Sequence, residues 1–158
     1  MSREIIRCKW CEVSPTYIKY HDTEWGIPVF KDQKLFEYLL LETFQAGLSW
    51  ITILKKRENI RLAFNNFNTK KIAKYTDEKL KELKNNKGII RNHLKIKAAK
   101  KNAIAFIRIQ KEFGTFSKYI WEFTNQKTIK NKFKHVKEIP VKTTLSNQIS
   151  IDLKRRGF

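Results

Sequence analysis

The amino-acid sequence predicts an all-α fold in a single domain. Apolar residues recur three or four positions apart along most of the chain, which is the period of a helix with one buried face. Only residues 128–136 alternate as a strand would, and this stretch is too basic and too isolated to build a sheet. With 158 residues, of which 41% are hydrophobic and 13% aromatic, the chain can bury a core and is too apolar for disorder.

The first half of the chain contains the clearest helical patterns. Residues 34–43 place four apolar side chains on one stripe, and a second helical pattern begins at Leu48 and continues to Phe67. Thr69 and Thr76 are typical helix caps, and the acidic residues that follow Thr76 suit the first turn of a helix. We therefore expect helices to begin near both threonines.

The second half predicts a hairpin between two helices and then shorter helices. Two asparagines and a glycine within residues 85–91 interrupt the helix that follows Thr76. A long amphipathic helix is expected over residues 91–112, ended by Gly114. Apolar clusters at residues 119–123 and 144–153 predict two more helices, with Pro140 in the link before the last.

The charge of the chain favours a polyanionic partner. Thirty-four Lys and Arg against fifteen Asp and Glu give a net charge of +19, which in a folded domain is typical of nucleic-acid binding. Part of this excess accompanies abundant Asn and Ile and reflects a compositional bias. No apolar run approaches the roughly 20 residues of a membrane span, and no signal peptide is visible. We expect a cytoplasmic monomer that does not bind membranes.

The hairpin centred on Gly88 is the first candidate site. A glycine lets a backbone approach a phosphate closely, amides at the following helix N-terminus can face the anion, and Lys87, Arg91 and Lys95 supply positive charge. Helix-hairpin-helix modules hold a DNA strand in this way without reading its sequence. A glycine between helices is also the common way to end a helix, so the local sequence leaves both interpretations open.

Cysteine and histidine form a second candidate site. Cys8 and Cys11 are separated by two residues and followed by His21, a donor set that suits zinc. A structural zinc site takes four ligands, however, and no fourth partner follows. Free thiols are an equally good interpretation of the local sequence.

A third candidate site combines aromatic residues with a carboxylate. Glu42 lies on or beside the apolar stripe of its helix, where an unpaired carboxylate costs several kcal/mol, so we expect it to be buried and to bind a ligand. Gly47 supplies a flexible backbone point beside it. A buried carboxylate among stacking rings suits an extruded methylated purine. The predicted pocket set comprises Trp10, Tyr17, Tyr20, Trp25, Glu42, Gln45 and Trp50.

In their order along the chain, these motifs resemble the DNA-3-methyladenine glycosylase I family, part of the helix-hairpin-helix superfamily. The resemblance covers essentially the whole chain. Its motifs are residues 7–10, 15–28 and 35–37, then Glu42 with residues 45–50, residues 54–58, Gly88 to Arg91, Lys95 with Ile96, Trp121, Pro140 and residues 154–158.

The resemblance implies a base-excision repair enzyme that hydrolyses the N-glycosidic bond of 3-methyladenine in alkylated double-stranded DNA and leaves an abasic site. It implies that Glu42 hydrogen-bonds the base and is the candidate catalytic residue, that Tyr20 and Trp50 stack on the base, and that Leu48 wedges into the duplex. The hairpin residues Lys87, Gly88, Arg91 and Lys95 would hold the damaged strand.

The resemblance also implies a zinc site, of which Cys8 and His21 would be one half and to which Cys11 would be extra. Family members continue past the residues that match positions 154–158, through a further helix and the remaining zinc ligands. We therefore expect the domain of residues 1–158 to lack that segment and to hold zinc weakly. A shortened inactive form, or a non-enzymatic basic helical nucleic-acid-binding protein, is the alternative.

Overall fold

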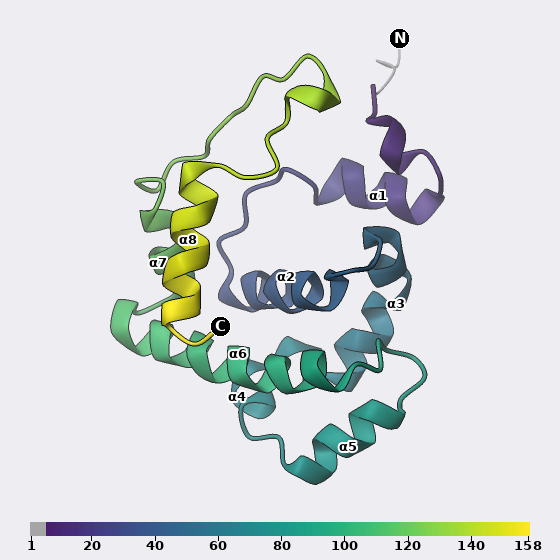
Figure 1. Cartoon of the computed structure of the whole chain (residues 1–158), viewed down its shortest axis with the longest axis vertical. Coiled ribbons are helices and arrows are strands. Elements are labelled where there is room, and N and C mark those ends of the chain that lie inside the picture. The colour runs from purple at the N-terminus through teal and green to yellow at the C-terminus, as the bar shows by residue number, and fades with distance from the viewer. Residues whose placement is uncertain (1–5) are drawn as a thin grey trace.

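The computed structural model describes residues 6–158 and is built from helices (Figure 1). Eight α-helices are α1 (Pro15–Thr23), α2 (Asp32–Gln45), α3 (Trp50–Ala63), α4 (Thr69–Ile72), α5 (Asp77–Asn85), α6 (His93–Phe113), α7 (Phe116–Glu122) and α8 (Thr144–Arg155). Three short 3-10 turns are η1 (Lys9–Cys11), η2 (Asn65–Phe67) and η3 (Val136–Glu138). The predicted all-α class is confirmed, and no strand occurs within the described range.

Local capping explains where several helices begin. The Thr76 hydroxyl accepts a hydrogen bond from the Lys79 amide and caps α5, as predicted. Asn68, rather than Thr69, caps α4. Helix α1 was not predicted from the sequence, although Ser14 caps it and Pro15 fits its first turn.

The helical pattern that was predicted to run from Leu48 to Phe67 is broken before its end. Helix α3 ends at Ala63, and Asn65, Asn66 and Phe67 have φ values of 49°, 54° and 57°. This left-handed turn is held from outside, because the Gln33 amide donates to the Asn66 carbonyl and the Tyr75 hydroxyl donates to the Asn65 side chain. The prediction of a continuous helix was therefore wrong at this point, and a hydrophobic period alone could not reveal the turn.

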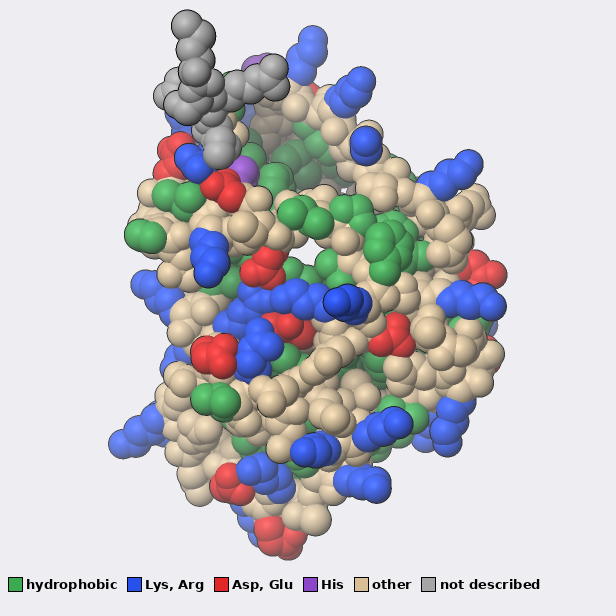
Figure 2. Space-filling view, turned by 180° about the vertical axis from the view of Figure 1, so that it is seen from behind, with side chains coloured by type: hydrophobic (Ala, Val, Ile, Leu, Met, Phe, Trp, Pro, Cys, Tyr) green, Lys and Arg blue, Asp and Glu red, His purple; other side chains and the backbone are tan. Residues whose placement is uncertain are grey.

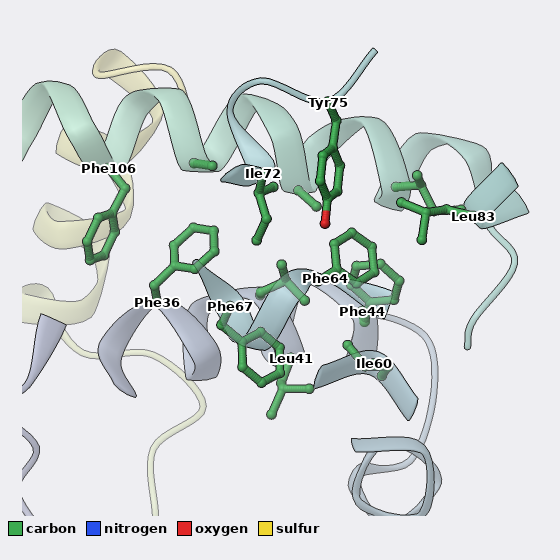
Figure 3. Packing of buried hydrophobic residues seen from close by; sticks show 14 of the residues in the cluster. Phe36, Leu41, Phe44, Ile60, Phe64, Phe67, Ile72, Tyr75, Leu83 and Phe106 are labelled. Atoms are coloured by element: carbon green, nitrogen blue, oxygen red, sulfur yellow. The ribbon is translucent and has the colours of Figure 1, made fainter. Parts of the chain in front are cut away.

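The core lies between α6 and the pair α2 and α3 (Figures 1 and 3). Phe36 and Phe44 of α2 lie on the side facing α6, in the cluster that includes Ile72, Leu83 and Phe106, whereas Leu41 lies beside Phe67 (Figure 3). Each such side chain, fully removed from water, stabilises the fold by about 1.5–3 kcal/mol. Core contacts therefore hold α2 in place, and residues of α2 that point away from the core, such as Glu42 and Gln45, can line a site.

The C-terminal helices pack against the end of α6. The Tyr119 hydroxyl of α7 donates to Asp152 of α8 at 2.8 Å, and Arg156 pairs with Glu112 of α6 at 2.8 Å. Asp32, at the start of α2, accepts hydrogen bonds from the Phe116 and Ser117 amides and so joins α2 to α7. None of the described helices is both long and apolar enough to cross a membrane.

Candidate active site

One cavity of about 300 Å³ brings together the seven residues of the predicted pocket set. Their elements are far apart in the sequence: η1 contributes one residue, α1 two, the turn after α1 one, α2 two and α3 one. Helix α1 lies across the ends of α2 and α3 that carry Glu42 and Trp50 (Figure 1). The walls are Trp10, Tyr17, Tyr20, Trp25, Glu42, Gln45 and Trp50.

Aromatic rings line most of this pocket and contact one another. The ring centroids of Trp10 and Tyr17 are 4.8 Å apart, and those of Trp10 and Trp25 are 5.3 Å apart. Tyr20 and Trp50 lie 5.5 Å apart with their planes tilted by 58°. Because these two rings already touch, a base sandwiched between them would require them to separate.

Glu42 opens onto the pocket and is exposed, so the prediction of a buried carboxylate was wrong. Its position beside the apolar stripe of α2 turns it toward the cavity. Enough protein surrounds the carboxyl group that burial still raises its pKa. Among residues 6–158 no group donates a hydrogen bond to Glu42, which leaves both oxygens available to a ligand.

The Tyr20 hydroxyl and the Trp50 indole are two other polar groups of the pocket. Burial, followed by the nearby carboxylates of Glu42 and Glu24, raises the pKa of Tyr20, so its phenol stays protonated at neutral pH. The Trp50 indole Nε1 is buried and finds no acceptor within the described part of the chain. The Tyr20 hydroxyl can therefore donate a hydrogen bond to a bound molecule.

The buried carboxylate of α2 is Glu37, which the sequence analysis did not single out. It is 4% exposed and contacts three cations: Arg57 at 2.8 Å, Arg61 at 3.1 Å and Lys34 at 3.1 Å. Arg57 also makes two 2.8 Å bonds to the two oxygens of Glu24, the residue after α1.

This ion-pair network connects the three helices that carry the pocket. Burial alone would raise the pKa of Glu24, but hydrogen bonds from Arg57 and Tyr38 lower it to about 2. Glu24 ends the last turn of α1, because its amide donates to the Tyr20 carbonyl at 2.9 Å. Arg57 lies on the same helix as Trp50. The network therefore fixes the Tyr20 wall relative to the Trp50 wall.

Leu48 stands at the tip of a tight turn beside the pocket. Its side chain is 38% exposed, and Gly47 before it has a φ of 79°, which favours glycine. Gln45 holds the turn from both sides: its side-chain amide donates to the Leu48 carbonyl and its carbonyl accepts from the Leu48 amide, both at 2.6 Å. Leu48 is therefore an exposed apolar residue on a turn held by Gln45, and its role as a wedge stays a prediction.

The hairpin between α5 and α6 contains Gly88 for a packing reason. A Cβ at this position would lie 3.0 Å from the Asn86 Oδ1 atom and 3.3 Å from the Asn59 side chain of α3. The Gly88 amide itself donates to Asn86 Oδ1 at 2.8 Å, so it is not free for a phosphate. In the described structure the amides of Ile90 and Arg91 have no acceptor, and these can face an anion.

The three basic hairpin residues differ in their surroundings. Lys87 and Arg91 are exposed, and neither pairs with a described carboxylate. The Lys95 ammonium instead donates to the carbonyls of Phe44 and Ala46 at 2.8 and 2.5 Å. Basic side chains are otherwise spread over the face in Figure 2 rather than gathered in one patch, which agrees with a partly compositional excess of charge.

Cys8 and His21 lie together beside the aromatic cluster. The Cys8 amide approaches His21 Nε2 at 3.5 Å, while His21 Nδ1 lies 2.9 Å from Asp22. The Arg7 guanidinium donates hydrogen bonds of 2.8 to 3.0 Å to Asp22. These bonds are the main cause that lowers the pKa of Asp22 to about 2. The His21 Nε2 atom therefore faces the backbone amide of Cys8, and the contact does not involve the Cys8 thiol.

Zinc binding stays a prediction, because the described residues do not form a complete metal site. Residues 6–158 contain no group of three or more His, Cys, Asp or Glu side chains arranged for a metal. The Cys11 Sγ atom points elsewhere and lies 3.0 Å from the Cys8 carbonyl, and burial raises the pKa of this thiol. Cys11 is therefore a protonated, buried thiol. A closed four-coordinate site would need two further ligands from outside the described residues.

Comparison with known proteins identifies the family. The family model described as methyladenine glycosylase matches residues 10–158, so the chain belongs to the methyladenine glycosylase family. It is 48% identical to the DNA-3-methyladenine glycosylase of Haemophilus influenzae, over 96% of this chain and 82% of that protein. It is 43% identical to DNA-3-methyladenine glycosylase 1 of Escherichia coli, over 96% of this chain and 81% of that protein.

Solved structures agree with the predicted fold. A crystal structure of 3-methyladenine DNA glycosylase I superposes with a TM-score of 0.93 at 41% identity, covering 97% of this chain and 84% of that one. The Staphylococcus aureus 3-methyladenine DNA glycosylase I, studied for its recognition of 3-methyladenine, gives a TM-score of 0.90 at 35% identity, covering 92% and 78%. The helix-hairpin-helix glycosylase-like architecture is confirmed.

Proposed function

We propose that this chain is a DNA-3-methyladenine glycosylase that hydrolyses the N-glycosidic bond of 3-methyladenine in double-stranded DNA. The observation that carries the proposal is the aromatic pocket with one unpaired carboxylate, in a chain of this family. A flat cationic ring can stack on the aromatic walls once Tyr20 and Trp50 separate, and Glu42 supplies the opposite charge. The pocket and the hairpin come from one chain, so a monomer suffices.

The leaving group supplies much of the chemistry. Methylation at N3 makes the adenine cationic, so the bond between C1′ and N9 breaks with its electron pair moving to the base, which leaves neutral. Water adds its oxygen to C1′ and loses a proton to solvent, which gives an abasic site without cleavage of the strand. The enzyme then needs to select and hold the base more than to activate it.

The surroundings of the acidic residues support this division of work. After Asp77 the next aspartate is Asp152, which bonds Tyr119 and Arg156 on the far side of the fold. No aspartate is among the residues that line the pocket, so none is placed to act on the base. The pocket-lining carboxylate is Glu42, and we assign it the 6-amino group of the adenine.

That assignment predicts selectivity. Guanine carries a carbonyl where adenine carries its 6-amino group, and a carboxylate cannot accept a hydrogen bond from a carbonyl. Methylated duplex DNA should release 3-methyladenine and little 7-methylguanine, measured by chromatography of the freed bases. Comparable release of both bases would contradict the role of Glu42.

Free 3-methyladenine should also quench tryptophan fluorescence, because tryptophans line the pocket. Glu42→Ala should weaken this binding by about 2 kcal/mol through loss of a charge-assisted hydrogen bond, with little change for undamaged DNA. Glu82→Gln on α5 is a control, because this glutamate is exposed and, within residues 6–158, pairs with Lys79 alone. No quenching and no released base would favour the non-enzymatic nucleic-acid-binding alternative.

A further inference from the structure

Two lysines near the hairpin differ from the others because they turn inward. Lys56 of α3 and Lys95 of α6 are half-buried, whereas Lys87 and Arg91 are exposed. The Lys56 ammonium donates to the Lys87 and Gly88 carbonyls at 3.2 and 3.4 Å, and so attaches the hairpin to α3.

The Lys95 ammonium attaches the other side of the hairpin to the end of α2. Its acceptors are the carbonyls of Phe44 and Ala46, in the last turn and cap of that helix. Terminal carbonyls lack partners within the helix and lie at its negative end, so an ammonium group bonds them well. Two of the three N–H groups of Lys95 are therefore occupied, which leaves at most one for a phosphate.

Lys95 joins the hairpin to the end of α2, two elements with different predicted tasks in the reaction. It lies in the first turn of α6, directly after the hairpin, and its backbone amide donates to the cap residue Asn92. Its acceptors lie two and four residues before Leu48, on the helix that carries Glu42. The contact thus spans the element predicted to hold the strand and the elements predicted to wedge and to bind the base.

We propose that Lys95 is a positioning residue that fixes the hairpin relative to the Leu48 turn, rather than a phosphate contact. The inference rests on the proposed function. A strand held by the hairpin then places its damaged nucleotide at a fixed position relative to Leu48. Binding energy from the phosphate contacts can thereby help to position the base for reaction. Without the contact the two elements shift relative to each other, and a misplacement of about 1 Å can slow a reaction about 100-fold.

Lys95→Met tests this, because it keeps the stem and removes the charge and donors. Single-turnover release of 3-methyladenine should fall about 10- to 100-fold, while the affinity for free 3-methyladenine stays within about twofold. The slope of log K against log salt for undamaged duplex should stay unchanged. Lys87→Met is the matched control and should reduce that slope by about 0.9. Lys95→Arg retains donors for both carbonyls and should recover part of the rate.

A readout without catalysis separates this proposal from the function on which it rests. In duplex DNA with a tetrahydrofuran abasic analogue beside 2-aminopurine, insertion of the wedge should raise the fluorescence with the wild type and much less with Lys95→Met. A salt slope reduced as in Lys87→Met would make Lys95 a phosphate contact, and wild-type fluorescence in Lys95→Met would show that it positions nothing. If wild-type protein releases no base, the proposed function fails while the 2-aminopurine signal still decides the role of Lys95.

Discussion

Removal of Arg57 should be among the most damaging single changes outside the core. Its guanidinium makes three bonds of 2.8 Å, one to Glu37 and two to Glu24. Hydrogen bonds to charged groups contribute about 1.5–3 kcal/mol each, but they are not additive within one network. Breaking a buried pair costs about 3–5 kcal/mol, because the carboxylate that remains is desolvated and loses its main partner.

Glu37 keeps Lys34 and Arg61 after the substitution, and Glu24 is partly solvated, so we expect Arg57→Ala to cost about 3 kcal/mol. That is a large part of the roughly 5–15 kcal/mol by which a domain is stable. Urea unfolding followed by circular dichroism measures it, with the midpoint falling at an unchanged slope.

Arg61→Ala is the matched control for this measurement. Arg61 contacts Glu37 once at 3.1 Å, and its other partner, Glu58, is 71% exposed. Its loss should cost about 1 kcal/mol. If Arg57→Ala costs no more than Arg61→Ala, the network does not hold α1 against α2 and α3, and the reasoning fails.

Further predictions concern pH, the wedge and the metal. The folded-state pKa of Glu24 is lowered from 4.5 to about 2, so its stabilising contribution is complete above pH 4.5 and is lost as the pH falls toward 2. Unfolding free energies of Glu24→Gln should accordingly vary less over this window than those of the wild type, and parallel curves would contradict the pairing. Because the pKa of Glu42 is raised, binding of 3-methyladenine should weaken on acidification already above pH 4.5, and Glu42→Gln should remove that dependence in fluorescence titrations. Leu48→Ala should slow base release from duplex DNA and change stability by less than about 0.5 kcal/mol, since the side chain is an exposed one; an unchanged rate would exclude a wedge. We expect zinc to be held weakly, so dialysis against a mild chelator should leave little metal, whereas one tightly held zinc per chain that is lost in Cys8→Ala would show a complete site.

Local patterns were sufficient to predict the helical class and the membership of the pocket. The periods of α2 and α6 and the cap at Thr76 are properties of adjacent residues, which act before any tertiary contact forms. The turn after α3 was missed because its strained backbone is held by side chains of α2 and of the segment before α5. Such long-range support leaves no trace in a hydrophobic period.

The partners of charged residues were equally hidden. Arg57 is 33 residues from Glu24 and 20 from Glu37, so only the folded chain shows that the three meet. Lys95 resembles a phosphate contact in the sequence because it follows a basic hairpin, yet its acceptors are 49 and 51 residues away. Charge in a sequence therefore predicts a kind of partner and not which residue takes the role.

The two glutamates of α2 show how one helix can carry a structural carboxylate and a chemical one. Glu37 is buried and surrounded by three cations, so its charge is neutralised where it lies. Glu42, five residues later, has no cation among its described neighbours, and burial raises its pKa. In a chain of net charge +19, it is then an uncompensated negative group facing a pocket. Two carboxylates whose surroundings shift their charge in opposite directions, one neutralised by cations and one left unpaired, commonly take different roles. A cationic base is the ligand that relieves this imbalance, whereas a neutral base gains no such attraction.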